Sequence, residues 1–466
     1  MTLPQPPAQV DARTPAIDTS RRSSTVVPTT EPDPAAAGDR LDRLVTAGAK
    51  VIRVVHADLF GRQRAKAFPA SSLPQLREGF AYSKMSIAED LLGVPVDEDQ
   101  FSTVKGHPDL FARIEPESAV VPPWEPDAVW VLSSLWEHGE RSPLCARGAL
   151  ASARERLEAE LGLTGIAAGE PEFYLFEVDD DGKRVGAYAK NGVSYTIDRI
   201  TDPRGVVGRM HRSLIDFGIG VTVVNREFSP GQFEINLHHD ECQVAADQAF
   251  LLKTAIKELA ITEGLEANFM AKPVTGDEGS SLHFHLSLWD GDRNVFATDG
   301  ATEEGLSESL RHAIAGLQAH APAIMAFAAP TVNSYKRLQG DGLSPRTSNM
   351  GVDNRYAFVR IPPEGGSAAR FELRAGDASA SPHLLLAAML HAARDGIVRR
   401  LEPTDAGVAL PRSLEQSVAA LQASELFRDA FGDELVPIYA ALKRREIAAF
   451  ESTVTDWEWN LYHSHV

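Results

Sequence analysis

The amino-acid sequence predicts an α+β protein made of a small β-rich domain and a larger domain of mixed helices and strands. The chain has 466 residues, more than one simple hydrophobic core usually organises. Strand-like segments dominate residues 39–143, whereas amphipathic helices alternate with strands over residues 144–466. The change of pattern near residue 143 therefore indicates two folded domains.

A disordered extension is expected before the first domain, over residues 1–38. This stretch is rich in Pro, Ser, Thr and Ala and has few large apolar side chains. Such a composition cannot bury enough surface to offset the conformational entropy that ordering would cost.

The small domain begins with a helical pattern over residues 39–49. Residues 50–69 read as two strands joined by the turn "ADLFGR", where Gly61 supplies the backbone angle that a tight turn needs. Further strands are expected at residues 119–124 ("AVVPPW") and 128–136 ("AVWVLSSLW"). In the larger domain, apolar periodicity predicts helices over three ranges: 147–163, 243–264 and 382–400.

Charge and cysteine usage narrow the possible partners. The formal net charge is −19, which argues against nucleic acid or an anionic membrane and favours cations such as metal ions or amines, although solubility alone also explains it. Cys145 and Cys242 form no paired pattern, so a reducing cytoplasm is expected. No apolar run approaches the roughly 18 residues of a membrane span, and no secretion signal is recognisable.

Carboxylates interrupt two strand-like segments that are otherwise apolar. In "AAGEPEFYLFEV", Glu170 and Glu172 are two residues apart and therefore point to the same face of a strand. In "NREFSPGQFEINL", Glu227 and Glu234 flank a hairpin turn at residues 229–231. Like charges this close repel each other, and burying them unpaired is costly.

Two later segments repeat this arrangement. "SSLHFHLSLW" places His283 and His285 on one strand face, and "ARFELRAGD" aligns Arg370, Glu372 and Arg374. A hydrogen-bonded histidine pair and a structural ion-pair ladder would explain each segment alone. Neither of these two explanations accounts for so many carboxylates on strands whose other face is apolar. Oxygen ligands with a single imidazole suit Mg²⁺ or Mn²⁺, whereas zinc favours more Cys or His.

Basic residues gather in the same part of the sequence: Lys336, Arg337, Arg355, Arg360, Arg370 and Arg374. Hard metals beside several bidentate donors suit a polyphosphate and a carboxylate. The GxxxxGK[ST] phosphate-binding pattern does not occur. The residues by themselves therefore indicate a metal-dependent phosphoryl-transfer enzyme.

Together, these motifs resemble the glutamine synthetase family over nearly all of the chain after residue 40. The resemblance is carried, in this order, by "GEPEF", "EFSPGQFEI", "KP…GSSLHFHLSLW", "NSYKRL", "NRYAFVRIP", "RFELRAGD" and "VTDWEWNLY". It implies an N-terminal β-grasp domain over 39–143 and a catalytic domain over 144–466 with a curved, partly closed antiparallel sheet. It also implies a homo-oligomer, usually a dodecamer of two hexameric rings, with active sites between subunits.

The resemblance also implies a role for each matched residue. One metal would be held by Glu172, Glu227 and Glu234, and a second by Glu170, His283 and Glu372. The phosphates of ATP would face His285, Ser287, Arg355 and Arg360, and L-glutamate would be oriented by Gly279, Arg337 and Arg374. The implied reaction passes through γ-glutamyl phosphate, with Arg337 and Arg355 stabilising the transferred charge.

Two carboxylates that bind ammonium in the ammonia-using members are replaced here. Ser83 stands in the region that carries an aspartate in those members, and Leu343 stands where their flap glutamate would be. An Asn-Gly pair at the glutamate site reads Glu278-Gly279. An acidic stretch that includes Glu89 could attract a polycation, or could simply be a solvated loop.

These differences are similar to the γ-glutamylpolyamine synthetase branch of the family. We therefore expect a ligase that joins glutamate to putrescine, cadaverine or spermidine in polyamine catabolism. The alternatives are a monoamine ligase acting on ethanolamine, an ammonia-using glutamine synthetase, and an inactive ring-forming scaffold.

Overall fold

The computed structural model describes residues 38–97, 99–297, 305–340 and 342–466. The predicted disordered extension lies outside the described residues, apart from Gly38. Among the described residues, no helix is both long and apolar enough to cross a membrane.

The first part of the chain forms a six-stranded sheet with strand order β2-β1-β5-β4-β3, and β6 pairs with β5. β1 and β5 are parallel, and the other neighbours are antiparallel. The elements of this part are α1 (Arg40–Thr46), β1 (Val51–Ala57), β2 (Gln63–Pro69), α2 (Leu73–Arg77), β3 (Phe80–Ser83), β4 (Asp109–Ile114), β5 (Ala128–Glu137) and β6 (Glu140–Arg141).

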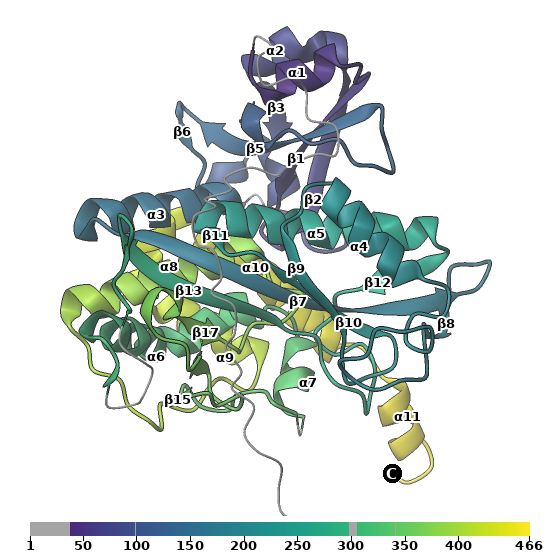
Figure 1. The fold of residues 1–466 in the computed structure, drawn as a ribbon. Coiled ribbons are helices and arrows are strands. Elements are labelled where there is room, and N and C mark those ends of the chain that lie inside the picture. The colour runs from purple at the N-terminus through teal and green to yellow at the C-terminus, as the bar shows by residue number, and fades with distance from the viewer. Residues whose placement is uncertain (1–37, 98, 298–304, 341) are drawn as a thin grey trace, which may run out of the picture.

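The second part is built on a curled, half-barrel sheet of eleven strands (Figure 1). Its main path is β15-β16-β17-β13-β7-β10-β9, with β8, β11 and β12 on β7 and β14 on β13. The strands are β7 (Thr164–Val178), β8 (Arg184–Ala187), β9 (Val221–Arg226), β10 (Gln232–Leu237), β11 (Asp240–Glu241), β12 (Leu265–Asn268), β13 (Leu282–Asp290), β14 (Arg293–Asn294), β15 (Met350–Val352), β16 (Val359–Ile361) and β17 (Phe371–Leu373).

Helices provide the other layer of this second part. α5 packs on β7, and α8 packs on α3, α5 and α6, so apolar helix faces and the sheet share one core. The helices are α3 (Ala146–Leu161), α4 (Val206–Asp216), α5 (Cys242–Thr262), α6 (Glu308–Ala328), α7 (Ser334–Leu338), α8 (Pro382–Arg399), α9 (Leu414–Ala423), α10 (Glu425–Glu451) and α11 (Asp456–Tyr462).

Most of the predicted elements are confirmed, and one is wrong. The three long helices predicted from periodicity are α3, α5 and α8, and Gly61 turns between β1 and β2 with φ +70°. Residues 119–124 do not form a strand, and only Val120 makes an isolated bridge, with Trp130. Pro122 and Pro123 lack the N–H groups that would extend the ladder. The division of the chain at residue 143 stays a prediction.

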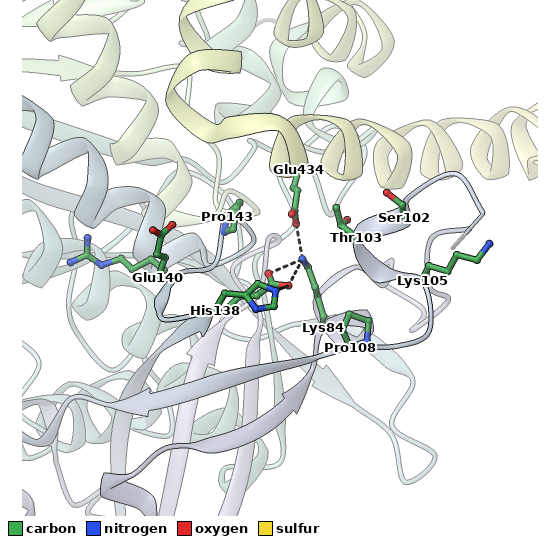
Figure 2. A pocket seen from close by; sticks show the side chains of 11 residues that line it. Lys84, Ser102, Thr103, Lys105, Pro108, His138, Glu140, Pro143 and Glu434 are labelled. Carbon is green, nitrogen blue, oxygen red and sulfur yellow. Dashed lines mark hydrogen bonds and ion pairs between the residues drawn. The ribbon is translucent and has the colours of Figure 1, made fainter.

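A buried ion-pair network joins the two parts of the chain. The Lys84 ammonium pairs with Glu434 of α10, as Figure 2 shows, and also with Glu137 of β5. Both N–O distances are 2.8 Å, and the lysine side chain is only 1% exposed. The network lines a cavity of about 530 Å³ that contains none of the predicted site residues. Lys84 therefore holds together two carboxylates from β5 and α10, elements far apart in the sequence.

We expect Lys84→Met to lower the free energy of unfolding by about 3 kcal/mol, because it leaves two partly buried carboxylates facing each other without a cation. Urea denaturation of the full chain measures this change. The control is Lys105→Met, since Lys105 pairs with Asp99 where both side chains are mostly exposed; we expect a loss below about 1 kcal/mol. Equal losses in the two variants would contradict a special role for the Lys84 network.

Candidate functional site

Three adjacent strands bring four of the predicted metal ligands to one face of the curled sheet. Glu172 of β7 lies directly opposite Glu234 of β10. Glu170 of β7 lies directly opposite His283 of β13. Side chains of directly opposed residues in antiparallel strands lie on the same face. Since Glu170 and Glu172 also share a face of β7, all four groups meet on one surface.

Two further strands extend this row of polar side chains. Glu372 of β17 lies opposite His285 of β13 on one side and opposite Arg360 of β16 on the other. Arg360 Nη1 donates to Glu372 Oε2 at 2.9 Å, and Arg374 donates to Glu372 Oε1. His283 Nδ1 lies 3.3 Å from Glu372 Oε1. The buried Glu372 carboxylate is thus surrounded by donors.

Glu227, which follows β9, joins the opposite end of the row. Its Oε1 accepts a hydrogen bond of 2.8 Å from Asn225 Nδ2. Burial and then the charge of Glu172 raise the pKa of Glu227 to about 7. Burial, followed by the charges of Glu172, Glu170 and Glu227, raises the pKa of Glu234 to about 10. At this end the carboxylates share a space where their anionic forms need a cation.

The electrostatics differ at the Glu170 end. Burial acts to raise the pKa of Glu170, but the neighbouring His283 and His285 outweigh it and hold that pKa well below its ordinary value. Burial, with the charge of Arg374, lowers the pKa of His283. A neutral imidazole beside ionised carboxylates is the protonation state that a metal ligand requires.

A second histidine also reaches this group of carboxylates. Oxygen or nitrogen atoms of Glu170, His285 and Glu372 all lie within 4.8 Å of one another. His285 Nε2 is 3.2 Å from Glu170 Oε1, yet it is buried without a hydrogen bond, while its Nδ1 accepts from Arg370 Nε at 3.2 Å. An unsatisfied buried nitrogen beside two carboxylates fits a divalent cation. The structure therefore brings both His283 and His285 to the second predicted metal position, to which the resemblance assigned only His283.

Neutral side chains that the sequence interpretation did not single out hold these carboxylates. Ser281 donates from its hydroxyl and its backbone N–H to Glu172, and Gln232 Nε2 donates to Glu172 Oε2 at 3.1 Å. Asn236 Nδ2 donates to Glu170 Oε1 at 2.9 Å. The signal was present in the sequence: each of these residues lies two positions from a predicted ligand and therefore on the same strand face.

The residues predicted to orient glutamate lie close together. Arg337 is buried and donates to the carbonyl oxygens of Ala375 and Arg374, at 3.2 and 3.4 Å. A Cβ atom on Gly279 would lie only 2.6 Å from Arg337 Cγ, so a side chain here would collide with the arginine. Arg374 Nε donates to the Arg355 carbonyl at 2.8 Å. Gly279, Arg337 and Arg374 therefore form one packed group.

Three of the residues predicted to face ATP lie on β13 and β16, and the fourth, Arg355, lies in the turn before β16. Ser287 occupies the same face of β13 as His283 and His285, and its hydroxyl accepts from Trp289 Nε1 at 2.9 Å. Arg360 bridges Glu372 and Asp353. The Arg355 side chain is exposed.

The three residues assigned to an amine pocket do not meet within one chain. Ser83 and Glu89 belong to the N-terminal part, whereas Leu343 follows α7. Figure 1 shows β3 and α7 on opposite sides of the curled sheet. Glu89 also forms an ion pair of 3.1 Å with Arg64, so its charge is already partly neutralised.

Comparisons with known proteins agree with this arrangement. The family described as glutamine synthetase, catalytic domain, matches residues 143–462. A glutamine synthetase of Pyrococcus abyssi is 31% identical over 451 residues, covering 90% of this chain and 97% of the relative. A glutamate–isopropylamine ligase of a Pseudomonas species is 33% identical over 376 residues, covering 77% and 82%.

Solved structures show the same fold. A complex of a protein called GmaS with ADP aligns with a TM-score of 0.81 and 30% identity, covering 92% of this chain and all of the GmaS chain. Ligand-free GmaS aligns with a TM-score of 0.80. The matched domain, these relatives and the row of carboxylates lead to one conclusion: the chain belongs to the glutamine synthetase family and is an ATP-dependent glutamate–amine ligase.

Proposed function

We propose that this ligase joins the γ-carboxylate of glutamate to a polyamine such as putrescine, cadaverine or spermidine, as a step of polyamine catabolism. The observation that carries the proposal is the neutral character of two positions, Ser83 and Leu343, where ammonia-using members of the family have carboxylates. Weak capture of a small cation and an apolar wall both favour an amine that carries carbon. The glutamate–isopropylamine ligase among the relatives acts on such an amine by its name.

The catalytic site would hold two divalent ions, Mg²⁺ or Mn²⁺. Glu172, Glu227 and Glu234 would bind one ion. Glu170, His283 and Glu372 would bind the other, with His285 as a further ligand or a phosphate contact. Bound ions would stabilise negative charge on the transferring phosphoryl group. Five carboxylates with imidazole suit these hard cations, and the raised pKa values of Glu227 and Glu234 support a missing positive charge.

The remaining site residues would position the substrates. Gly279, Arg337 and Arg374 would hold glutamate so that its γ-carboxylate oxygen attacks the terminal phosphorus of ATP, releasing ADP. Arg355 and Arg360, with Ser287, would face the phosphates, and the arginines Arg337 and Arg355 would balance the developing charge. The neutral amine nitrogen then attacks the γ-carbonyl carbon, the bond to phosphate breaks, and the proton lost by the nitrogen leaves with inorganic phosphate.

A ring-shaped homo-oligomer, a dodecamer of two hexamers, would complete the site. Ser83 is exposed on the N-terminal sheet, so it could act only in the site of a neighbouring subunit. The C-terminal helix α11 projects from the body of the molecule (Figure 1). Its Trp457 and Trp459 side chains are 66% and 64% exposed. Large exposed apolar groups of this kind favour burial against another subunit.

The expected location is the cytoplasm.

A small monoamine is the second candidate substrate. Charged groups of the acidic stretch that could attract a polycation have partners within the chain: Glu89 with Arg64, Asp90 with Arg445, and Asp99 with Lys105. This pairing reduces the attraction for a distant second ammonium group. The isopropylamine ligase among the relatives supports the same alternative.

The proposed function is tested by measuring ATP- and glutamate-dependent phosphate release with ammonium, ethanolamine, isopropylamine, putrescine, cadaverine, spermidine and spermine. We expect kcat/KM for the diamines and polyamines to exceed that for ammonium by about 100-fold, since the site lacks two ammonium-binding carboxylates. Mass spectrometry identifies each γ-glutamylamide. Preference for ethanolamine or isopropylamine would select the monoamine alternative. Preference for ammonium would refute both, and no turnover with any amine would favour a scaffold.

The raised carboxyl pKa values predict how the stability of the metal-free protein depends on pH. Between the ordinary value of 4.5 and about 7, folded Glu227 keeps a proton that the unfolded chain has lost. Glu234, with a pKa of about 10, does the same over a wider range. The free energy of unfolding should therefore fall as pH rises from 5 to 7, by about 5 kcal/mol for the two groups together.

Urea denaturation with EDTA at several pH values measures this fall. Glu227→Gln should reduce the dependence by about half, because Glu234 remains, whereas Glu78→Gln, at an exposed position, should leave it unchanged. Added Mn²⁺ should stabilise the native protein more at pH 7 than at pH 5, because the ion replaces bound protons. A pH dependence that is the same in both variants would show that Glu227 does not cause it.

The flap position gives a direct test of amine choice. Leu343→Glu, alone or combined with Ser83→Asp, should lower KM for ammonium about tenfold and raise KM for putrescine, because it restores charge and removes apolar surface. Leu343→Gln is the matched control, which adds polarity without charge. An unchanged KM for ammonium in both glutamate variants would mean that pocket shape, and not these charges, decides the substrate.

A further inference from the structure

The backbone of Glu278 is held firmly beside the carboxylate row, the set of predicted metal-binding glutamates Glu170, Glu172, Glu227, Glu234 and Glu372. Its N–H donates to Ser229 Oγ at 2.8 Å, and its carbonyl oxygen accepts from the Tyr174 hydroxyl at 2.7 Å. Ser229 lies in the turn between β9 and β10, and Tyr174 lies on β7. Both contacts therefore anchor Glu278 to the strands that carry the predicted metal ligands.

A single amide connects this position to the carboxylate row. Gln232 Nε2 donates to the carbonyl oxygen of Gly279 at 3.0 Å and to Glu172 Oε2 at 3.1 Å. Burial lowers the pKa of Arg337, and the charge of Glu278 is one of those that oppose this effect. Glu278 is thus close enough to act electrostatically on the glutamate-orienting group.

The carboxylate of Glu278 is not used by these contacts. Its side chain is exposed, and the described residues give it no hydrogen bond or ion pair, whereas the nearby Lys272 ammonium donates to the carbonyl of Asp277. Glu278 Oε2 lies 2.6 Å from the point that a Cβ atom would occupy on Gly342. Gly342 immediately precedes Leu343, so the free carboxylate lies against the flap segment that has lost its own glutamate.

We propose that Glu278 binds the ammonium group of the incoming amine and so replaces the missing flap carboxylate from the loop that lies against the flap. This inference rests on the proposed ligase reaction with an amine. A carboxylate accepts strong charge-assisted hydrogen bonds from an ammonium group. Leu343, on the adjacent flap, supplies apolar surface for the carbon chain. Charge from one loop and apolar surface from the other would together select a carbon-bearing amine.

Glu278→Gln tests this role with amines of different charge. At pH 8, alkylamines and ammonium are mostly protonated, whereas hydroxylamine is mostly neutral but still attacks an acyl phosphate. We expect KM for protonated amines to rise about 10- to 100-fold, the cost of losing a hydrogen bond to a charged group. Turnover with hydroxylamine, and KM for glutamate and ATP, should change less than about threefold. Continued hydroxylamine turnover also shows that the variant is folded.

Two control variants sharpen the result. Asp277→Asn removes the same charge one residue away and should leave KM for every amine nearly unchanged. Glu278→Asp keeps the charge and should recover part of the affinity for protonated amines. Equal losses for hydroxylamine and protonated amines, or a rise confined to KM for glutamate, would overturn the proposal. A wild-type preference for ammonium would instead refute the proposed substrate class, while the same comparison, made with ammonium, would still test Glu278.

Discussion

Mutual repulsion among buried carboxylates is the constraint on which the rest of the structure depends. Glu170, Glu172 and Glu234 lie on adjoining strands, and Glu227 follows at the end of the row. Their unfavourable interaction appears directly in the raised pKa values of Glu227 and Glu234. A fold tolerates such a concentration only if its scaffold is rigid and a cation is available during function. The long central strand and the helix layer behind it provide that rigidity.

The protein holds these carboxylates in two different ways, with charged donors at one end of the row and neutral donors at the other. At the Glu372 end, burial is outweighed by the charges of His283, His285 and Arg374, which hold the pKa of Glu372 below its ordinary value. Arg360 and Arg374 also donate hydrogen bonds to this carboxylate. At the Glu172 end, Ser281 and Gln232 supply neutral donors. Neutral donors orient a carboxylate without cancelling its charge. The second end therefore keeps its demand for a cation, and this difference distinguishes the two proposed metal positions.

Strand alternation made much of this site predictable, because period two determines which side chains share a face whatever the tertiary fold. The same rule would have found Gln232, Asn236 and Ser281. It failed at residues 119–124, where two prolines remove backbone donors. Strand alternation also could not predict side-chain contacts between residues far apart in the sequence. Arg64 neutralises Glu89 across 25 positions, and Arg370 contacts His285 across 85 positions. Such contacts depend on how the chain folds back on itself, which no local pattern contains.

The proposed amine contact and the proposed metal ligands are joined physically through one short stretch of chain. Gln232 bridges Glu172 and the carbonyl of Gly279, and the preceding residue, Glu278, lies against the flap. The loop backbone is held by Ser229 and Tyr174. A substitution of the Glu278 side chain would therefore change the charge beside the flap while the backbone stays tied to the row of carboxylates. A scaffold of this kind lets amine specificity change while the phosphoryl-transfer machinery stays the same.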